Sequence, residues 1–182
     1  MIKIAYSGIE GCFAYMAARR LFPDELYVPF ENFGKAYEAV DNAVCDMAVL
    51  PIRNSYAGAV KEVNELLERG NLHIIDTYPL PIVQNLIGLR GSRIGDIKTV
   101  ISHIKALEQC DNYIRLHGYN TVTSTNTAIA AQEMIDRQDL SFATIASLET
   151  AARYGLKVLD EKINEADDNI TTFAVVARDK NA

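Results

Sequence analysis

Short apolar runs of strand length alternate along the chain with segments whose apolar residues recur at helical spacing. Strand-like runs fall at 2–6, 46–52, 72–77, 82–89, 99–102, 121–123, 142–146, 157–159 and 171–177, and helical patterns at 13–22, 32–42, 60–69, 105–116, 127–137 and 148–154. Pro79 and Pro81 separate two of the extended runs. Such alternation is typical of βαβ units. The pattern therefore predicts an α/β protein with mostly parallel sheets.

Hydroxyl and amide side chains stand where the predicted strands give way to helices. They are Ser7, Asn54, Ser55, Ser102, Ser124, Thr125 and Ser147. Helix capping explains most of them, since such side chains accept hydrogen bonds from the free amides of a first helical turn. The same junctions also suit an anionic ligand, because open α/β sheets bind ligands beyond the carboxyl ends of their strands, at helix N-termini. Capping and an anion-binding pocket both remain open.

Charge and composition narrow the class of function. The 182 residues carry a formal net charge of −6 with scattered basic residues, whereas a nucleic-acid binder usually shows a basic stripe. No apolar run is long enough to cross a bilayer, and the first residues read as a strand and not as a signal peptide. We therefore expect a cytoplasmic protein that binds neither nucleic acid nor membrane.

The cysteines and histidines give no metal pattern. Cys12, Cys45 and Cys110 are odd in number, and no CxxC, HExxH or HxH motif occurs. Reduced thiols are the simplest interpretation, without disulfides or a zinc site. His103 has no acidic partner close to it in the sequence, so a structural role is favoured over that of a general base.

Several junction loops carry candidate ligand-binding residues. The loop from Gly8 to Gly11 is neither a GxGxxG fingerprint nor a phosphate loop, and its glycines suit a tight turn or a close approach of backbone to ligand. Asn54 is either a turn residue or an amide that orients a carboxylate or hydroxyl. Arg53 is either a surface charge or a fork for a carboxylate.

The pair Ser102 and Gln109 is a further candidate. The two residues are seven apart, which is two helical turns. A serine at the cap position and Gln109 would then share one face of the following helix.

Five blocks of residues, taken in order, resemble the prephenate dehydratase family. They are Gly8-x-Glu10-Gly11-x-Phe13, Pro51-Ile52-x-Asn54-Ser55-x-x-Gly58-x-Val60, Ser102-His103-x-x-Ala106-Leu107-x-Gln109-Cys110, Ile145-Ala146-Ser147 with Tyr154-Gly155-Leu156, and Asn169-x-Thr171-x-Phe173. Their order and spacing cover nearly the whole chain. Joint agreement of separate blocks is far more specific than any one of them.

The resemblance implies an architecture and an assembly. The fold would be α/β with two lobes and a central cleft, similar to type II periplasmic binding proteins. Lobe one would hold 1–77 with 161–182, and lobe two 78–160. A homodimer or larger homo-oligomer is favoured. The family pattern commonly continues into a regulatory ACT domain, so we expect no phenylalanine feedback within this chain, which carries the catalytic domain only.

The resemblance also implies a carbon–oxygen lyase that needs no metal or organic cofactor. Prephenate loses its ring carboxylate as carbon dioxide and its ring hydroxyl as water, giving phenylpyruvate for phenylalanine biosynthesis. Thr171 would donate its hydroxyl hydrogen to the leaving oxygen. The residues expected to bind this small carboxylate, from the motifs and the junctions together, are Gly8, Gly11, Arg53, Asn54, Ser55, Ser102, Lys105, Gln109, Thr125 and Phe173.

The chain departs from the family pattern at three places. The pattern has Glu, Pro-Gln and Arg where this sequence has Arg53, Ile104-Lys105 and Thr172. Our hypothesis is that Arg53 or Lys105 replaces the lost carboxylate partner. Two alternatives stay open: a relative that acts on prephenate or a similar carboxylate with another outcome, such as decarboxylation only, and a non-catalytic small-molecule binding protein. The choice between prephenate and its amino analogue arogenate also stays open.

Overall fold

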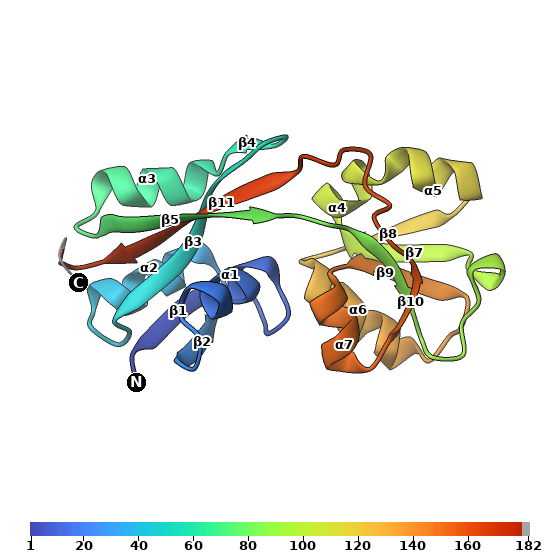
Figure 1. Cartoon of the computed structure of the whole chain (residues 1–182), viewed down its shortest axis with the longest axis horizontal. Helices are drawn as coiled ribbons and strands as arrows, with labels where there is room; N and C mark the ends of the chain where they lie inside the picture. The colour runs from blue at the N-terminus through green and yellow to red at the C-terminus, as the bar shows by residue number, and fades with distance from the viewer. Residues whose placement is uncertain (180–182) are drawn as a thin grey trace. The chain divides into compact units, whose positions relative to one another are not determined.

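A computed structural model describes residues 1–179 as two compact units (Figure 1). The first unit holds Met1–Ile82 and the C-terminal segment from Asp168, and the second holds Val83–Asp167. The sequence placed these divisions a few residues earlier, after residues 77 and 160. The first of them lies later because strand β5 (His73–Pro81) continues through Pro79 at the edge of its sheet, where a proline is tolerated.

The first unit is built on one mixed sheet. Its strands lie in the order β2 (Leu26–Phe30), β1 (Lys3–Ser7), β3 (Met47–Asn54), β11 (Ile170–Ala177) and β5, and the short β4 (Gly58–Ala59) pairs with β3. Strand β1 runs parallel to β2 and β3, whereas β11 runs antiparallel to β3 and β5. The last strand of the chain therefore lies between two strands of the N-terminal segment.

Helices cover both faces of this sheet. Helices α2 (Phe33–Asp41) and α3 (Lys61–Arg69) share one buried cluster with Ala5 of β1. Tyr6 points to the opposite face, where its ring centroid lies 5.4 Å from that of Tyr15 in helix α1 (Phe13–Leu21). Successive residues of β1 thus bury their side chains against different helices.

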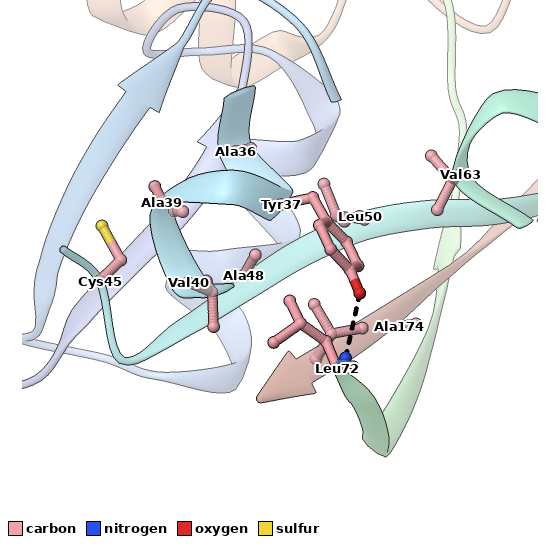
Figure 2. Close-up of a cluster of buried hydrophobic side chains, with 12 residues drawn as sticks. Ala36, Tyr37, Ala39, Val40, Cys45, Ala48, Leu50, Val63, Leu72 and Ala174 are labelled. Carbon is pink, nitrogen blue, oxygen red and sulfur yellow. Dashed lines mark hydrogen bonds between the residues drawn. The ribbon is translucent and has the colours of Figure 1, made fainter. Parts of the chain in front are cut away.

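Tyr37 joins the core on the α2 side to the backbone at the start of β5. Its ring is packed among apolar side chains that include Leu50 and Ala174, and its hydroxyl oxygen accepts a hydrogen bond of 3.0 Å from the backbone N–H of Leu72 (Figure 2). Gly70 leaves room for this contact, since a Cβ there would lie 2.0 Å from the Tyr37 hydroxyl. The buried hydroxyl of Tyr37 thus has a hydrogen-bond partner within the core.

A β-bulge in β3 decides which side chains of this strand face those of β11. The register pairs Phe173 with Pro51 but Thr172 with Arg53, so Ile52 has no partner on β11. The carbonyl of Ile52 instead accepts hydrogen bonds from the N–H of Val60 and the side-chain amide of Asn64. Because side chains alternate along a strand, one extra residue moves everything beyond it to the other face.

The second unit is also built on a mixed sheet. The order is β10 (Lys157–Asp160), β6 (Asn85–Gly88), β9 (Phe142–Ala146), β7 (Thr99–His103) and β8 (Asn120–Ser124). Strand β7 runs parallel to β8 and β9, and β6 runs antiparallel to β9 and β10. A short 3-10 helix, η1 (Ile94–Asp96), precedes β7.

Its helices again divide between the two faces. Helices α4 (Ile104–Gln109) and α5 (Asp111–His117) pack with Val100 and Ile145. Helix α6 (Thr127–Arg137) packs with Ile101, and α7 (Leu148–Tyr154) with Ile87. None of the helices in residues 1–179 has the length and apolar character that a bilayer crossing needs.

The α/β class is confirmed, while two local expectations need correction. The sheets are mixed and not mostly parallel, because β11, β6 and β10 enter against the direction of their neighbours. The helical pattern at 105–116 forms two helices that meet at Cys110, a fully buried residue with a non-helical ψ of 19°. Strand β2 was not predicted, since its short run LYVPF contains a proline.

Candidate functional site

The residues with the most distinctive geometry lie where β3 ends and β11 begins. Asn54, the last residue of β3, stands opposite Thr171 in the ladder. The bulge at Ile52 turns both side chains to the same face. The Asn54 amide nitrogen then donates a hydrogen bond of 2.9 Å to the Thr171 hydroxyl oxygen. Two residues 117 positions apart in sequence thus share one buried hydrogen bond.

The amide of Asn54 is held in one orientation. Its oxygen accepts hydrogen bonds of 3.0 Å from the backbone N–H groups of Tyr56 and Ala57, in the turn after β3. Its nitrogen must therefore face β11, where it reaches Thr171 and, at 2.8 Å, the side-chain oxygen of Asn169. The backbone of the turn fixes which end of the amide meets the hydroxyl.

This arrangement makes Thr171 a hydrogen-bond donor. A threonine hydroxyl has one hydrogen and two lone pairs, and Asn54 occupies one lone pair. Within residues 1–179 the Thr171 hydrogen has no acceptor, and the residue is 9% exposed. Accepting one hydrogen bond strengthens the one that the same hydroxyl donates. The free hydrogen is available to an oxygen atom outside the chain.

Asn169 belongs to the same cluster, although the sequence did not mark it as a site residue. It is 3% exposed, its side-chain oxygen accepts from Asn54, and its side-chain nitrogen has no partner among the described residues. The available signal was its place in the block that ends at Phe173. Nothing in that block alone says that an asparagine there contacts the amide of Asn54.

Ser55 and Tyr56 connect the turn after β3 to the segment that leads into β11. The Ser55 hydroxyl donates to the carbonyl of Asp168 at 3.1 Å and accepts from the N–H of Ile170 at 2.9 Å. The hydroxyl of Tyr56 donates to the carboxylate of Asp168. Ser55 therefore holds the chain just before Thr171, and the proposal that it binds substrate stays a prediction.

The remaining predicted residues of the first unit occupy different surroundings. Phe173 is 2% exposed and lies two residues along β11 on the face of Thr171. Gly8 and Gly11 have φ angles of 110° and 94°, which glycine adopts without strain. Arg53 is exposed and lies opposite Thr172, on the face away from Asn54. The glycines supply the tight turn that their spacing predicted.

Ser102 in the second unit uses its hydroxyl within the sheet. Its side chain is fully buried and donates a hydrogen bond of 2.7 Å to the carbonyl of Ile145 on β9. Thr144 of β9 donates back to the carbonyl of Ile101 at 2.8 Å. The cap of α4 is His103, whose Nδ1 accepts from the N–H of Lys105. Ser102 is therefore a strand residue and not the cap residue that was expected.

Gln109 ends α4 and pairs with a glutamine that the sequence did not mark. The side-chain nitrogen of Gln84 donates to the side-chain oxygen of Gln109 at 3.1 Å. Gln84 is 2% exposed, and its own side-chain oxygen lacks a partner within residues 1–179. The pairing leaves the amide hydrogens of Gln109 as donors. Gln84 follows a strand and a proline, and its sequence surroundings give no sign of this contact.

Lys105 and Thr125 lie at the surface of the second unit. Lys105 forms an exposed ion pair of 2.8 Å with Glu108, one turn along α4. Thr125 is exposed in the bend between β8 and α6. Within residues 1–179 there is no cluster of three or more His, Cys, Asp or Glu side chains that could hold a metal ion.

Comparison with known proteins gives a consistent family. The family model described as prephenate dehydratase matches residues 4–181. The chain is 38% identical over 178 residues to "Arogenate dehydratase/prephenate dehydratase 1, chloroplastic" of Arabidopsis thaliana, which covers 98% of this chain and 45% of that protein. The chain thus spans less than half the length of this curated relative.

Solved structures agree at the level of the fold. Prephenate dehydratase from Arthrobacter aurescens, in complex with L-Phe, has a TM-score of 0.91 at 29% identity, covering 98% of this chain and 61% of that one. A protein described as a novel type of quorum quenching acylase, GqqA, has a TM-score of 0.88 at 27% identity, covering 97% and 64%. The ligand-binding component of an ABC-type import system from Staphylococcus aureus, at 14% identity and a TM-score of 0.51, covering 97% and 66%, shares the fold alone.

Proposed function

This chain belongs to the prephenate dehydratase family, and from that premise we propose that it catalyses the decarboxylating dehydration of a cyclic carboxylate, prephenate or arogenate. The Arabidopsis relative is described as an arogenate dehydratase/prephenate dehydratase, and the Arthrobacter protein as a prephenate dehydratase. The product would be phenylpyruvate from prephenate or phenylalanine from arogenate. The reaction is an elimination, so the class is a carbon–oxygen lyase.

One observation carries the proposal: the uncommitted hydrogen of the Thr171 hydroxyl beside the Asn54 amide. In the elimination, the electrons of the ring carbon–carboxylate bond enter the ring as carbon dioxide departs, and the ring carbon–hydroxyl bond breaks. The leaving oxygen then needs a hydrogen-bond donor or a proton. Thr171 supplies it, and water restores the hydrogen afterwards. Since the ring becomes aromatic, the protein chiefly orients the substrate and assists the departing hydroxyl.

Two of the predicted residues have donors of the kind that bind a carboxylate. Gln109 keeps its amide hydrogens free of the Gln84 contact, and amide hydrogens bind carboxylate oxygens. Arg53 adds an exposed guanidinium, which can meet a carboxylate in a bidentate way. That Gln109 and Arg53 bind substrate stays a prediction, and we propose that Thr171 acts at the leaving oxygen.

The test is turnover by the purified chain with each substrate in turn. Phenylpyruvate is followed by absorbance and phenylalanine by chromatography, with all products identified by mass spectrometry and the reaction without protein subtracted. Thr171→Ala should lower kcat by roughly 10²- to 10⁴-fold, the usual contribution of a positioned acid. Thr171→Ser should keep part of the activity because it keeps the hydroxyl.

Other outcomes would contradict the proposal. A decarboxylated product that retains the hydroxyl points to a divergent relative, and binding without conversion points to a small-molecule binding protein. Hydrolysis of an acyl substrate would assign the chain to the chemistry named for GqqA. The cytoplasmic location and the homodimer stay predictions, to be tested by cell fractionation and analytical ultracentrifugation.

A further inference from the structure

We propose that Asn169 is a positioning residue, which acts through Asn54 to keep the Thr171 hydroxyl a donor. This inference rests on the proposed function, since it concerns the same cluster. It concerns the amide–amide contact of 2.8 Å between the Asn54 nitrogen and the Asn169 oxygen, which adjoins the contact of 2.9 Å from the same nitrogen to Thr171.

The first step concerns the two hydrogens of the Asn54 amide. An amide nitrogen carries two hydrogens in fixed directions. Their acceptors are the Asn169 oxygen at 2.8 Å and the Thr171 oxygen at 2.9 Å, and the backbone carbonyl of Ile170 lies farther away, at 3.3 Å from the same nitrogen. The bond to Asn169 therefore fixes the rotation of the amide plane. With that plane fixed, the second hydrogen stays on the lone pair of Thr171, and the hydroxyl hydrogen of Thr171 is kept out of that contact.

The second step concerns the orientation of Asn169 itself. Asn54 presents hydrogens to it, because the Asn54 oxygen is occupied by the backbone N–H groups of Tyr56 and Ala57. Asn169 must therefore accept with its side-chain oxygen. Its own side-chain nitrogen is left buried without a partner among the described residues. The orientation follows from the network and not from the surroundings of Asn169 alone.

The third step is the cost of this arrangement. A buried donor without a partner destabilises the folded state, and such groups are rare in native proteins. An apolar side chain of similar size at position 169 would remove this donor, but it would also deprive the Asn54 amide of its acceptor at 2.8 Å. Asn169 is nevertheless only 3% exposed, and its side-chain oxygen accepts a hydrogen bond from Asn54. In return for the unpaired donor, the asparagine provides an acceptor that orients the Asn54 amide beside Thr171.

The experiment compares two substitutions at position 169 with a matched control. Asn169→Leu keeps the approximate size and removes the acceptor, while Asn169→Asp keeps an oxygen that accepts from Asn54. We expect Asn169→Leu to lower kcat by roughly 10²-fold, the scale of a misplaced reacting group, in protein that is still folded at the assay temperature. Asn169→Asp should regain most of the lost kcat, with a higher KM from its added charge.

The control is Asn32→Leu in the same unit. Asn32 caps α2 through a bond to the N–H of Lys35, so its loss should lower the melting temperature and leave kcat as it was. A purely structural role for Asn169 would give the same pattern as this control and would overturn the proposal. An equal loss of kcat in Asn169→Asp and Asn169→Leu would also overturn it, since the buried nitrogen would then be the working group.

A readout without turnover separates this inference from the proposed function. In ¹⁵N NMR spectra the two amide hydrogens of Asn54 should exchange slowly with water in the wild type and in Asn169→Asp. They should exchange much faster in Asn169→Leu. If the wild type converts neither substrate, the proposed function fails while this measurement still decides the role of Asn169. Unchanged exchange in Asn169→Leu would refute the positioning role whatever the activity.

Discussion

Arg53 stands directly opposite Thr172 in the ladder between β3 and β11. In the family pattern that the sequence resembles, Glu and Arg are expected at these two positions. This chain keeps the guanidinium at this pair of positions but on the other strand. Because of the bulge at Ile52, both side chains lie on the face away from Asn54 and Thr171. The departures at 53 and 172 therefore fall on one pair of facing positions.

This pairing leads to the hypothesis that Arg53 supplies the positive charge that is missing at position 172. We expect Arg53→Ala to weaken substrate binding by about 2–5 kcal/mol, the cost of leaving a carboxylate without its partner. The measurement is KM, or calorimetric affinity in a Thr171→Ala background. The double variant Arg53→Glu with Thr172→Arg restores the family arrangement and should recover affinity.

The control for that charge is Arg19→Ala. Arg19 lies 5.8 Å from the ring centroid of Tyr15 on α1 and belongs to no candidate cluster. Its loss should leave the affinity as it was. If Arg53→Ala binds substrate as tightly as the wild type does, the compensation hypothesis is wrong, and Arg53 is a surface charge.

A second prediction separates the two jobs of Asn54. Asn54→Asp keeps an oxygen for the N–H groups of Tyr56 and Ala57 but cannot donate to Thr171 when ionised. We expect the turn to survive and kcat to fall by roughly 10²-fold, as for other lost donors in an active site. Circular dichroism checks the fold, and steady-state kinetics checks the loss. A variant with the kcat of the wild type would show that the Asn54–Thr171 bond has no part in the reaction.

The block containing Thr171 was visible in the sequence, but its partners were not. Alternation along β3 would place Asn54 on the same face as Ile52, and only the bulge brings it to Thr171. None of the residue types in Pro51-Ile52-Arg53 indicates a bulge. The contact between Asn54 and Asn169 likewise depends on a pairing across 115 positions, which local periodicity cannot supply.

Helix and strand positions were easier to predict than their environments. The patterns at 127–137, 142–146 and 148–154 coincide with α6, β9 and α7. Each has strong periodicity and a clear end, such as Gly155 with a φ angle of 62° after α7. The environment of Ser102 was not predicted. Its place before a helix suggested a helix cap, whereas its hydroxyl donates a hydrogen bond to the neighbouring strand β9.

Ser102→Ala should accordingly affect stability more than catalysis. The lost bond from the Ser102 hydroxyl to the carbonyl of Ile145 is buried, and a bond of this kind contributes about 1 kcal/mol to the free energy of unfolding. Urea denaturation measures this change, while KM and kcat should match the wild type. A raised KM with unchanged stability would instead support the original expectation that Ser102 contacts substrate.

The buried cysteines should react slowly in the native protein. Burial raises the pKa of the Cys12 thiol from 9.0 to about 11 and that of Cys110 to about 12. Only the thiolate reacts, so at mildly alkaline pH the reactive fraction of Cys12 falls about 100-fold below that of a free thiol. Labelling with a thiol reagent should be slow in buffer and fast in urea. Rapid labelling of the native protein would contradict the burial of these side chains.

His103 should make the stability of the second unit depend on pH. Burial lowers the pKa of this imidazole below 6.5, and the charge of Lys105 lowers it further, while Glu108 acts in the opposite direction. The neutral ring also caps α4, since its Nδ1 accepts from the N–H of Lys105 at 3.2 Å. The unfolded chain therefore takes up the proton first as the pH falls. The stability that the neutral ring contributes is complete above about pH 6.5 and is lost as the pH drops through the folded pKa.

The measurement is an NMR titration of the His103 ring together with urea denaturation across this pH range. We expect a titration midpoint below 6.5 and a loss of stability on the acid side. His103→Asn provides the matched control, because asparagine can cap the helix but does not titrate. This variant should lose less stability than the wild type over the same interval. A midpoint at or above 6.5, or an identical acid loss in His103→Asn, would show that the neutral ring does not stabilise α4 and that other groups cause the pH dependence.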